Sequence, residues 1–275
     1  MLLSVSIVGL GQIGGSLGLA LKNKTLKDRY YVTGIARKKE TLKAALKIGA
    51  VDDSSLSLTS ARNSDIVIIC TPVDTIVSIY KKLVKIVKKN TVITDSGSVK
   101  YSIEREINDI NSRVSFVGSH PMAGRAKNGL RSASADMFKN AKVIITPGRY
   151  GKFEKIVSKV WKDTGAKIVK MSAKDHDELV AFTSHLPHVI AFSLNKAYKK
   201  IKKKNPYIDD LIAGSFKSIT RVSVSSADMW APIFVSNAKN IDKCLDEFIK
   251  EINIFKKNLN DKRKIKKEIL KIQTG

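Results

Sequence analysis

The sequence predicts an α/β fold in which a doubly wound parallel sheet is followed by an all-helical domain. Short apolar runs alternate with helical patterns up to about residue 171, and beyond that point only helical patterns remain. A glycine-rich turn at residues 9–15, GLGQIGG, directly follows the first apolar run. Such a turn between a strand and a helix is typical of Rossmann-type nucleotide-binding units. We therefore expect a dinucleotide-binding domain at 1–171 and an all-helical domain at 172–275.

The strands of the first domain are expected at residues 5–8, 31–35, 66–70, 91–94, 114–117 and 143–146. Most of these runs are continuously apolar, which is typical of parallel strands covered by helices on both faces. Helices are expected at 40–48, 76–87 and 152–162, and an apolar segment at 17–21 follows the glycine turn.

The second domain is expected to hold helices at 175–183, 189–202, 208–216 and 228–237, and one long basic helix from 241 onward. Apolar stripes run along these helices, so each must bury a face against another element. We expect the helices to form one wall of the substrate site and the interface of a homodimer.

The composition is that of an ordinary globular protein, with 43% apolar and 27% charged residues. It contains no run of about 18 apolar residues, so we expect no membrane-spanning segment. The first apolar run leads directly into the glycine turn, which indicates a strand and not a signal peptide. Two cysteines do not make a disulfide framework, so the expected location is the cytoplasm.

The formal net charge of +25 raises the alternative of a nucleic-acid-binding protein. Lysines are scattered along the predicted helices without interleaved aromatic residues, and no recognisable nucleic-acid-binding module is present. We interpret the charge as a solvated lysine-rich surface that attracts anionic cofactors and substrates. No nucleic-acid partner is expected.

The glycine turn supplies the expected nucleotide site. Gly9 permits a tight turn, Gly11 lets the backbone approach a pyrophosphate, and Gly14 allows close packing of helix on strand. The positive end of the following helix attracts the phosphates. The expected cofactor-binding residues are Gly9, Gly11, Gln12, Ile13, Gly14, Arg37, Lys38, Thr71 and Pro72.

The end of the second predicted strand indicates the preferred cofactor. An NAD site usually has an acidic residue there for the ribose 2′-hydroxyl, whereas this chain continues with Arg37, Lys38 and Lys39 before the first acid, Glu40. A guanidinium matches the geometry of a phosphate. The sequence therefore predicts NADP, with NAD as the alternative.

A dehydrogenase also needs a proton acceptor beside the nicotinamide. The chain has only four histidines, and His120 lies in a segment of small residues and proline, GSHPMAG at 118–124. Glycine and proline of this kind hold a backbone turn near a ligand. His120 is therefore the candidate base.

Several motifs occur in the same order as in a known protein family. They are GLGQIGGS at 9–16, DSGSVK at 95–100, GSHPMAG at 118–124, HD at 176–177, SHLPH at 184–188, TR at 220–221 and MW at 229–230. With these motifs the chain resembles prephenate dehydrogenase and its arogenate-using relatives over nearly its whole length. The resemblance implies oxidative decarboxylation of prephenate to 4-hydroxyphenylpyruvate in tyrosine biosynthesis. From the length of the chain we expect no fused mutase domain and no substantial regulatory domain after the helices.

The same resemblance implies roles for individual residues. His120 is the catalytic base, Ser98 orients it by a hydrogen bond, and Arg221 clamps a substrate carboxylate, a task that suits a bidentate guanidinium. Further substrate contacts are expected from Ser184, His185, His188 and Trp230. Although His185 and His188 are three residues apart, no acidic or thiol residues cluster nearby, so no metal site is expected.

The chain departs from the family pattern at two positions. Many relatives have Thr-Glu after the glycine at 124, where this chain has Arg125 and Ala126. Relatives often have aspartate three residues before the clamp arginine, where this chain has Ser218. Loss of both acids predicts an electropositive entrance, which favours the dianion prephenate over arogenate.

Three alternatives remain open at this point. Arogenate dehydrogenase would form tyrosine directly. A β-hydroxyacid dehydrogenase would share the fold but normally uses a lysine near the nicotinamide. A non-enzymatic NADP-sensing or nucleic-acid-binding protein would account for the glycine turn and the charge, but would not need His120, Ser98 and Arg221 together.

Overall fold

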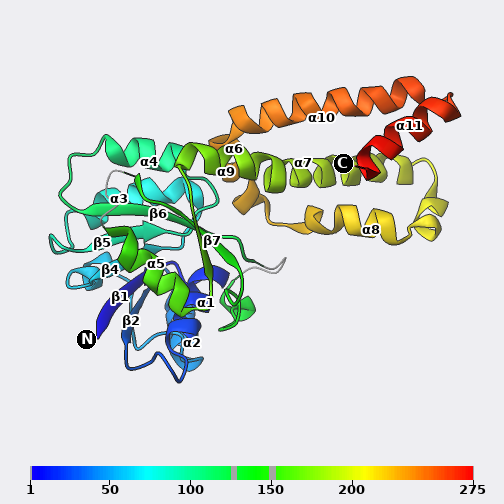
Figure 1. The fold of residues 1–275 in the computed structure, drawn as a ribbon. Helices are drawn as coiled ribbons and strands as arrows, with labels where there is room; N and C mark the ends of the chain where they lie inside the picture. The colour runs from blue at the N-terminus through cyan, green and yellow to red at the C-terminus, as the bar shows by residue number, and fades with distance from the viewer. Residues whose placement is uncertain (1, 125–128, 149–152, 275) are drawn as a thin grey trace.

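The computed structural model describes residues 2–124, 129–148 and 153–274. Its first part is built on one eight-stranded sheet with the order β3-β2-β1-β4-β5-β6-β7-β8 (Figure 1). The strands are β1 Leu3–Val8, β2 Tyr30–Ile35, β3 Asp53–Ser55, β4 Ile66–Ile69, β5 Val92–Asp95, β6 Ser115–Pro121, β7 Lys142–Thr146 and β8 Lys167–Lys170. The order of the first six strands is that of a Rossmann fold.

One pairing in this sheet differs from the expected all-parallel arrangement. Strands β6 and β7 are antiparallel, with Gly118 opposite Thr146 and Pro121 opposite Val143, whereas the other neighbouring strands are parallel. A parallel connection needs a crossover, usually a helix. The described part of the β6–β7 connection holds the short 3₁₀ turn Leu130–Ser132 and further turns but no α-helix, and β7 returns beside β6 in the opposite direction. The short polar strand β3 was also missed, because DSS carries no apolar pattern.

Helices cover both faces of the sheet. They are α1 Gln12–Leu21, α2 Lys39–Lys47, α3 Ile76–Leu83, α4 Tyr101–Asn108 and α5 Glu154–Asp163. Alternate strand residues point to opposite faces. Ile7 and Ile68 accordingly share one apolar cluster with Leu17 and Trp161, while Val67 and Ile69 belong to a second cluster with Tyr80.

From Ala173 onward the described residues form helices and turns. The α-helices are α6 Ala173–Val180, α7 Leu186–Lys202, α8 Gly214–Thr220, α9 Ala227–Ser236, α10 Ala238–Asn258 and α11 Lys262–Gln273. A π-helical turn, Ala181–His185, joins α6 to α7. Helices α7, α8 and α10 extend away from the sheet (Figure 1). Trp230 and Ile233 of α9 join the second cluster, which ties the helical part to the sheet.

Two predicted helices are interrupted. The predicted helix 208–216 is divided between the 3₁₀ turn Pro206–Leu211 and α8, because Ile212 and Ala213 between them have extended backbones. The predicted continuous helix from 241 is divided into α10 and α11. The break lies at Asp261. Its side chain accepts hydrogen bonds from the backbone N–H groups of Arg263 and Lys264 and so caps a new helix. None of the described helices is long and apolar enough to cross a bilayer.

Candidate active site

A cavity of about 430 Å³ lies between the carboxyl ends of the strands and the helical part of the chain. Gln12 and Ile13 of α1 and Ser98 after β5 contribute to its lining from the nucleotide-binding part. Other expected site residues also line it, and these are His120, Ser184, His188, Arg221 and Trp230. Residues that the sequence predicts for the cofactor, the base and the substrate thus meet at one cavity.

The glycine turn has the shape that a dinucleotide requires. Gly9 has a positive φ of 98°, and a Cβ there would lie 2.8 Å from the carbonyl oxygen of Cys70. A Cβ on Gly14 would lie 2.0 Å from the carbonyl oxygen of Gly9. A Cβ on Gly11, in contrast, would meet no atom within 4 Å, so space remains in front of the loop at the start of α1. The residues fit a pyrophosphate group at a helix N-terminus.

Thr71 and Pro72 lie beside this turn. They follow β4, the neighbour of β1 on the side opposite β2, and a Cβ on Gly9 would lie 2.9 Å from Cγ2 of Thr71. The hydroxyl of Thr75 donates to the Pro72 carbonyl at 2.7 Å and is hydrogen-bonded to the hydroxyl of Thr71 at 2.7 Å. The strand order reverses between β1 and β4, which is where open α/β sheets bind ligands.

Arg37 and Lys38 follow β2 and are exposed. Lys38 is the N-cap residue of α2. Neither side chain forms an ion pair with another residue in the described ranges. Both cations are therefore available to an anionic ligand.

His120 lies near the end of β6 and is buried, with 8% of its surface exposed. Its Nδ1 is 2.8 Å from Nε2 of His176 on α6, and Nδ1 of His176 is 2.7 Å from Oδ1 of Asp177. Burial, followed by the nearby His176, Lys100 and His185, holds the pKa of His120 well below 6.5. His120 is thus neutral at neutral pH and can accept a proton.

Ser98 lies in a loop that is closed by an ion pair. Lys100 Nζ contacts Oδ2 of Asp95 and donates to the carbonyl of Ser119 at 3.0 Å, and the three residues are buried. Asp95 also accepts the backbone N–H groups of Gly97 and Ser119. These contacts fix the loop against β6, so Ser98 and His120 line the same cavity. The hydrogen bond at Nδ1 of His120 goes to His176 and not to Ser98.

The helical part supplies an aromatic and cationic wall. The ring of His188 stacks on Trp230 with centroids 3.6 Å apart, and Nδ1 of His188 is 2.9 Å from the carbonyl oxygen of Ser184. Burial lowers the pKa of His188, and the positive charge of Arg221 lowers it further. Arg221 is exposed at the start of the 3₁₀ turn Arg221–Val224. A guanidinium in this position can bind a carboxylate that enters the cavity.

His185 lies outside the lining of the cavity. It is 1% exposed, its Nδ1 is 3.1 Å from Nδ2 of Asn237, and burial lowers its pKa to about 4. Asn237 also donates to the backbone carbonyl of Asp177 at 2.8 Å. His185 packs edge-on against Trp230, so its position is behind the wall that His188 and Trp230 form.

The pair His176 and Asp177 was not among the expected site residues, although HD at 176–177 was one of the motifs. Its signal was the motif alone, because a histidine and an aspartate on a predicted helix do not reveal which strand they face. Met122, Met229, Ser96 and Ser225 also line the cavity and were not expected there. Within the described ranges no group of three or more His, Cys, Asp or Glu side chains could hold a metal ion.

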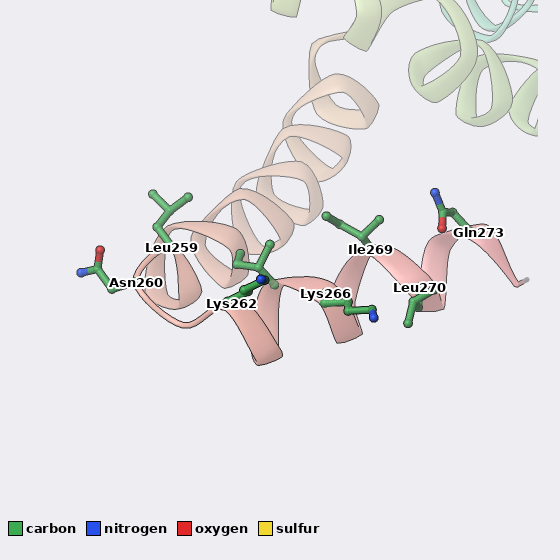
Figure 2. A pocket seen from close by; sticks show the side chains of 8 residues that line it. Leu259, Asn260, Lys262, Lys266, Ile269, Leu270 and Gln273 are labelled. Atoms are coloured by element: carbon green, nitrogen blue, oxygen red, sulfur yellow. The ribbon is translucent and has the colours of Figure 1, made fainter.

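A separate hollow lies at the corner between α10 and α11 (Figure 2). Leu259, Ile265, Ile269 and Leu270 give it an apolar lining, beside Asn260, Lys262, Lys266 and Gln273. It contains no carboxylate or imidazole among the described residues that line it, so it has no acid–base group of that kind for catalysis.

Comparison with protein families identifies the chain. Residues 17–170 match the prephenate dehydrogenase nucleotide-binding domain, and residues 172–271 match the prephenate dehydrogenase dimerization domain. The chain belongs to the prephenate dehydrogenase family. Members of this family are dehydrogenases, and this chain is an NAD(P)-dependent one.

Individual relatives agree with this assignment. Prephenate dehydrogenase of Bacillus subtilis is 36% identical over 255 residues, which are 91% of this chain and 68% of that protein. The crystal structure of Aquifex aeolicus prephenate dehydrogenase with hydroxyphenyl propionate and NAD⁺ has a TM-score of 0.88 at 30% identity, covering 100% of this chain and 97% of that chain. Synechocystis arogenate dehydrogenase has a TM-score of 0.83 at 25% identity, covering 99% and 98%. Both substrates thus occur in the names of relatives of this chain.

Proposed function

We propose that this prephenate dehydrogenase family member oxidises and decarboxylates prephenate, with His120 as the base and NADP as the preferred hydride acceptor. The proposal rests on one observation: the neutral, buried imidazole of His120 and the guanidinium of Arg221 line the same cavity beside the glycine turn. The imidazole suits proton removal from a hydroxyl group. The guanidinium suits a carboxylate.

The reaction needs little from the protein besides alignment and one proton acceptor. The nicotinamide, when bound, accepts the hydride from the carbinol carbon of the substrate. His120 takes the hydroxyl proton as the carbonyl forms. The ring carboxylate leaves as carbon dioxide, and its bonding electrons enter the ring while the π electrons of the new carbonyl move onto its oxygen. The ring becomes aromatic as a phenolate, which takes its proton back from the imidazolium of His120. Ser98, at the same cavity, is a hydroxyl group that can orient the substrate or His120.

The charge at the entrance supports prephenate over arogenate. Arg221 makes no ion pair with a described residue, and Ser218 is exposed on α8 where relatives often have an aspartate. Arg125 and Ala126, the second departure from the family pattern, lie outside the described residues. A cationic entrance attracts a dianion, whereas the ammonium group of arogenate would favour a nearby acid.

Arg37 and Lys38 support NADP as the preferred cofactor. They are exposed cations directly after β2, and the chain has no acid between Ile35 and Glu40 to accept a ribose 2′-hydroxyl. A 2′-phosphate would meet two positive charges and no carboxylate there.

We also propose a homodimer formed through the helical part of the chain. Exposed apolar side chains gather on the outer helices, among them Leu259, Ile269, Leu270 and Ile272. Figure 2 shows Leu259 at the corner of α10 and α11, and Ile269 and Leu270 further along α11. Burial of such a surface against a second copy would stabilise the dimer.

Steady-state assays that cross prephenate and arogenate with NAD⁺ and NADP⁺ test the proposal. The absorbance of reduced nicotinamide reports turnover. The expected result is the highest kcat/KM with prephenate and NADP⁺. A higher kcat/KM with arogenate would assign the chain to the arogenate-using branch, and no turnover in any combination would contradict the proposed reaction.

A further inference from the structure

Three buried side chains, His120, His176 and Asp177, are hydrogen-bonded in series, and this series ends at the cavity. His120 on β6 contacts His176 on α6, and His176 contacts Asp177. His176 is 0% and Asp177 is 2% exposed, so water does not compete for these contacts. The hydrogen-bonded series joins a strand and a helix that are far apart in the sequence.

Asp177 is held as an acceptor at both of its oxygens. Oδ1 accepts the backbone N–H of Lys100 at 2.8 Å, and Oδ2 accepts that of Tyr101 at 2.9 Å, at the start of α4. The positive end of a helix stabilises a carboxylate. An ionised carboxylate can only accept hydrogen bonds. Nδ1 of His176, 2.7 Å from Oδ1, must therefore carry a proton and donate it.

The positions of the ring protons on His176 and His120 then follow from this contact. A neutral imidazole has one N–H and one unprotonated nitrogen. Since Nδ1 of His176 donates to Asp177, its Nε2 is unprotonated and accepts from Nδ1 of His120. In neutral His120 the remaining nitrogen, Nε2, is then unprotonated. No described residue hydrogen-bonds to this nitrogen, and His120 lines the substrate cavity.

We infer that His176 and Asp177 are positioning residues, which hold His120 in the tautomer whose Nε2 is ready to accept the substrate's hydroxyl proton. With the opposite tautomer, His120 would present an N–H to that hydroxyl and could not remove its proton. The imidazolium that forms on proton transfer keeps its Nδ1–H bond to His176. The negative charge of Asp177 then offsets part of the repulsion from Lys100, which lies near His120.

The tautomers can be measured directly, because the chain has only four histidines. Long-range ¹H–¹⁵N spectra of the protein labelled with ¹⁵N-histidine distinguish protonated from unprotonated ring nitrogens, and His120→Asn and His176→Gln assign the signals. We expect Nδ1–H and unprotonated Nε2 at both His120 and His176 near neutral pH. A proton on Nε2 of either residue would overturn the inference.

The effect on catalysis rests on the proposed function, and variants at His176 test it. The glutamine of His176→Gln retains a side-chain carbonyl that can accept from His120, whereas His176→Phe retains only the ring. We expect kcat for prephenate to fall in the order wild type, His176→Gln, His176→Phe, with the last reduced about 10²–10⁴-fold and KM little changed. Equal kcat for the two variants, with both folded by melting curves, would overturn the positioning role.

Asp177→Asn is the matching test at the end of the hydrogen-bonded series that lies away from the cavity, with Glu178→Gln as its control. Glu178 is the next residue on α6, is exposed, and loses the same charge. We expect a large loss of kcat in Asp177→Asn and none in Glu178→Gln; equal kcat in the two would count against the inference.

The spectra need no substrate. An inactive protein with the expected tautomers would therefore contradict the proposed function alone, and an active one with a proton on Nε2 of His120 would contradict this inference alone.

Discussion

Asp95 and Lys100 form an ion pair whose side chains are 0% and 1% exposed, and the loop between them carries Ser98. The same two residues bind β6 at Ser119, next to His120. A buried ion pair gains little over an apolar pair of the same shape, but loss of one partner leaves an unpaired buried charge. The pair therefore fixes the loop and the strand that hold Ser98 and His120, two residues of the proposed active site.

Lys100→Met should destabilise the protein strongly, by about 3–5 kcal/mol in the free energy of unfolding, because it leaves Asp95 buried without its cation. Denaturant unfolding of the purified variant measures this. Lys88→Met is the control: its ion pair with Asp65 is exposed, and its loss should cost about 1 kcal/mol or less. Similar losses in the two variants would contradict the role of the buried pair.

The rate of the enzyme should persist into acidic solution. His120 acts as a base only when neutral, and its pKa lies well below 6.5 because of burial and the nearby His176, Lys100 and His185. Activity is therefore lost as the pH falls through that lowered pKa, and not near 6.5. The pH profile of kcat/KM reports the free enzyme. A half-maximal value at pH 6.5 or above on the acidic side would contradict the description of His120.

Arg221→Gln should raise KM for prephenate by about 10-fold or more and change kcat much less, since a hydrogen bond to a charged group contributes about 1.5–3 kcal/mol. The substrate loses a charge-assisted contact that is present before and during reaction. Arg62→Gln, at another exposed arginine that does not line the cavity, is the control. An unchanged KM in Arg221→Gln would remove the clamp role.

Arg37→Asp should shift the ratio of kcat/KM from NADP⁺ towards NAD⁺ by about 10-fold or more, because it replaces a phosphate partner by a carboxylate that accepts a 2′-hydroxyl. The control is Lys43→Glu, a charge reversal at an exposed position nearby in the sequence, within α2. A wild-type protein that already prefers NAD⁺, or an equal shift in the control, would show that Arg37 does not select the cofactor.

Local patterns predicted most of the fold. The glycine turn and the apolar runs located β1, β2, β4 and β5 to within one or two residues, because their signals are contained in short segments. The direction of β7 depends on a connection without a described α-helix, and that does not follow from the apolar pattern of β7 itself. The division of the last helix at Asp261 did have a local signal, an aspartate before a polar helical segment.

The site was predictable where a motif lines the cavity, and less so behind it. His120, Ser98 and Arg221 come from motifs, and all three line the cavity. The bond from His120 to His176 depends on how α6 packs against β6, which a linear sequence does not contain. Likewise, His188 lies at the cavity, whereas His185, the last residue of the π-helical turn, lies behind it, although the spacing alone treats the two histidines alike.

The role of His120 as the base can be measured through kcat of His120→Asn with prephenate and NADP⁺. Asparagine keeps a polar side chain of similar reach but cannot accept the proton. We predict a fall in kcat of about 10²–10⁴-fold, with unchanged nucleotide binding and an unchanged melting temperature. A kcat close to that of the wild type would show that another group removes the proton and that His120 is not the base.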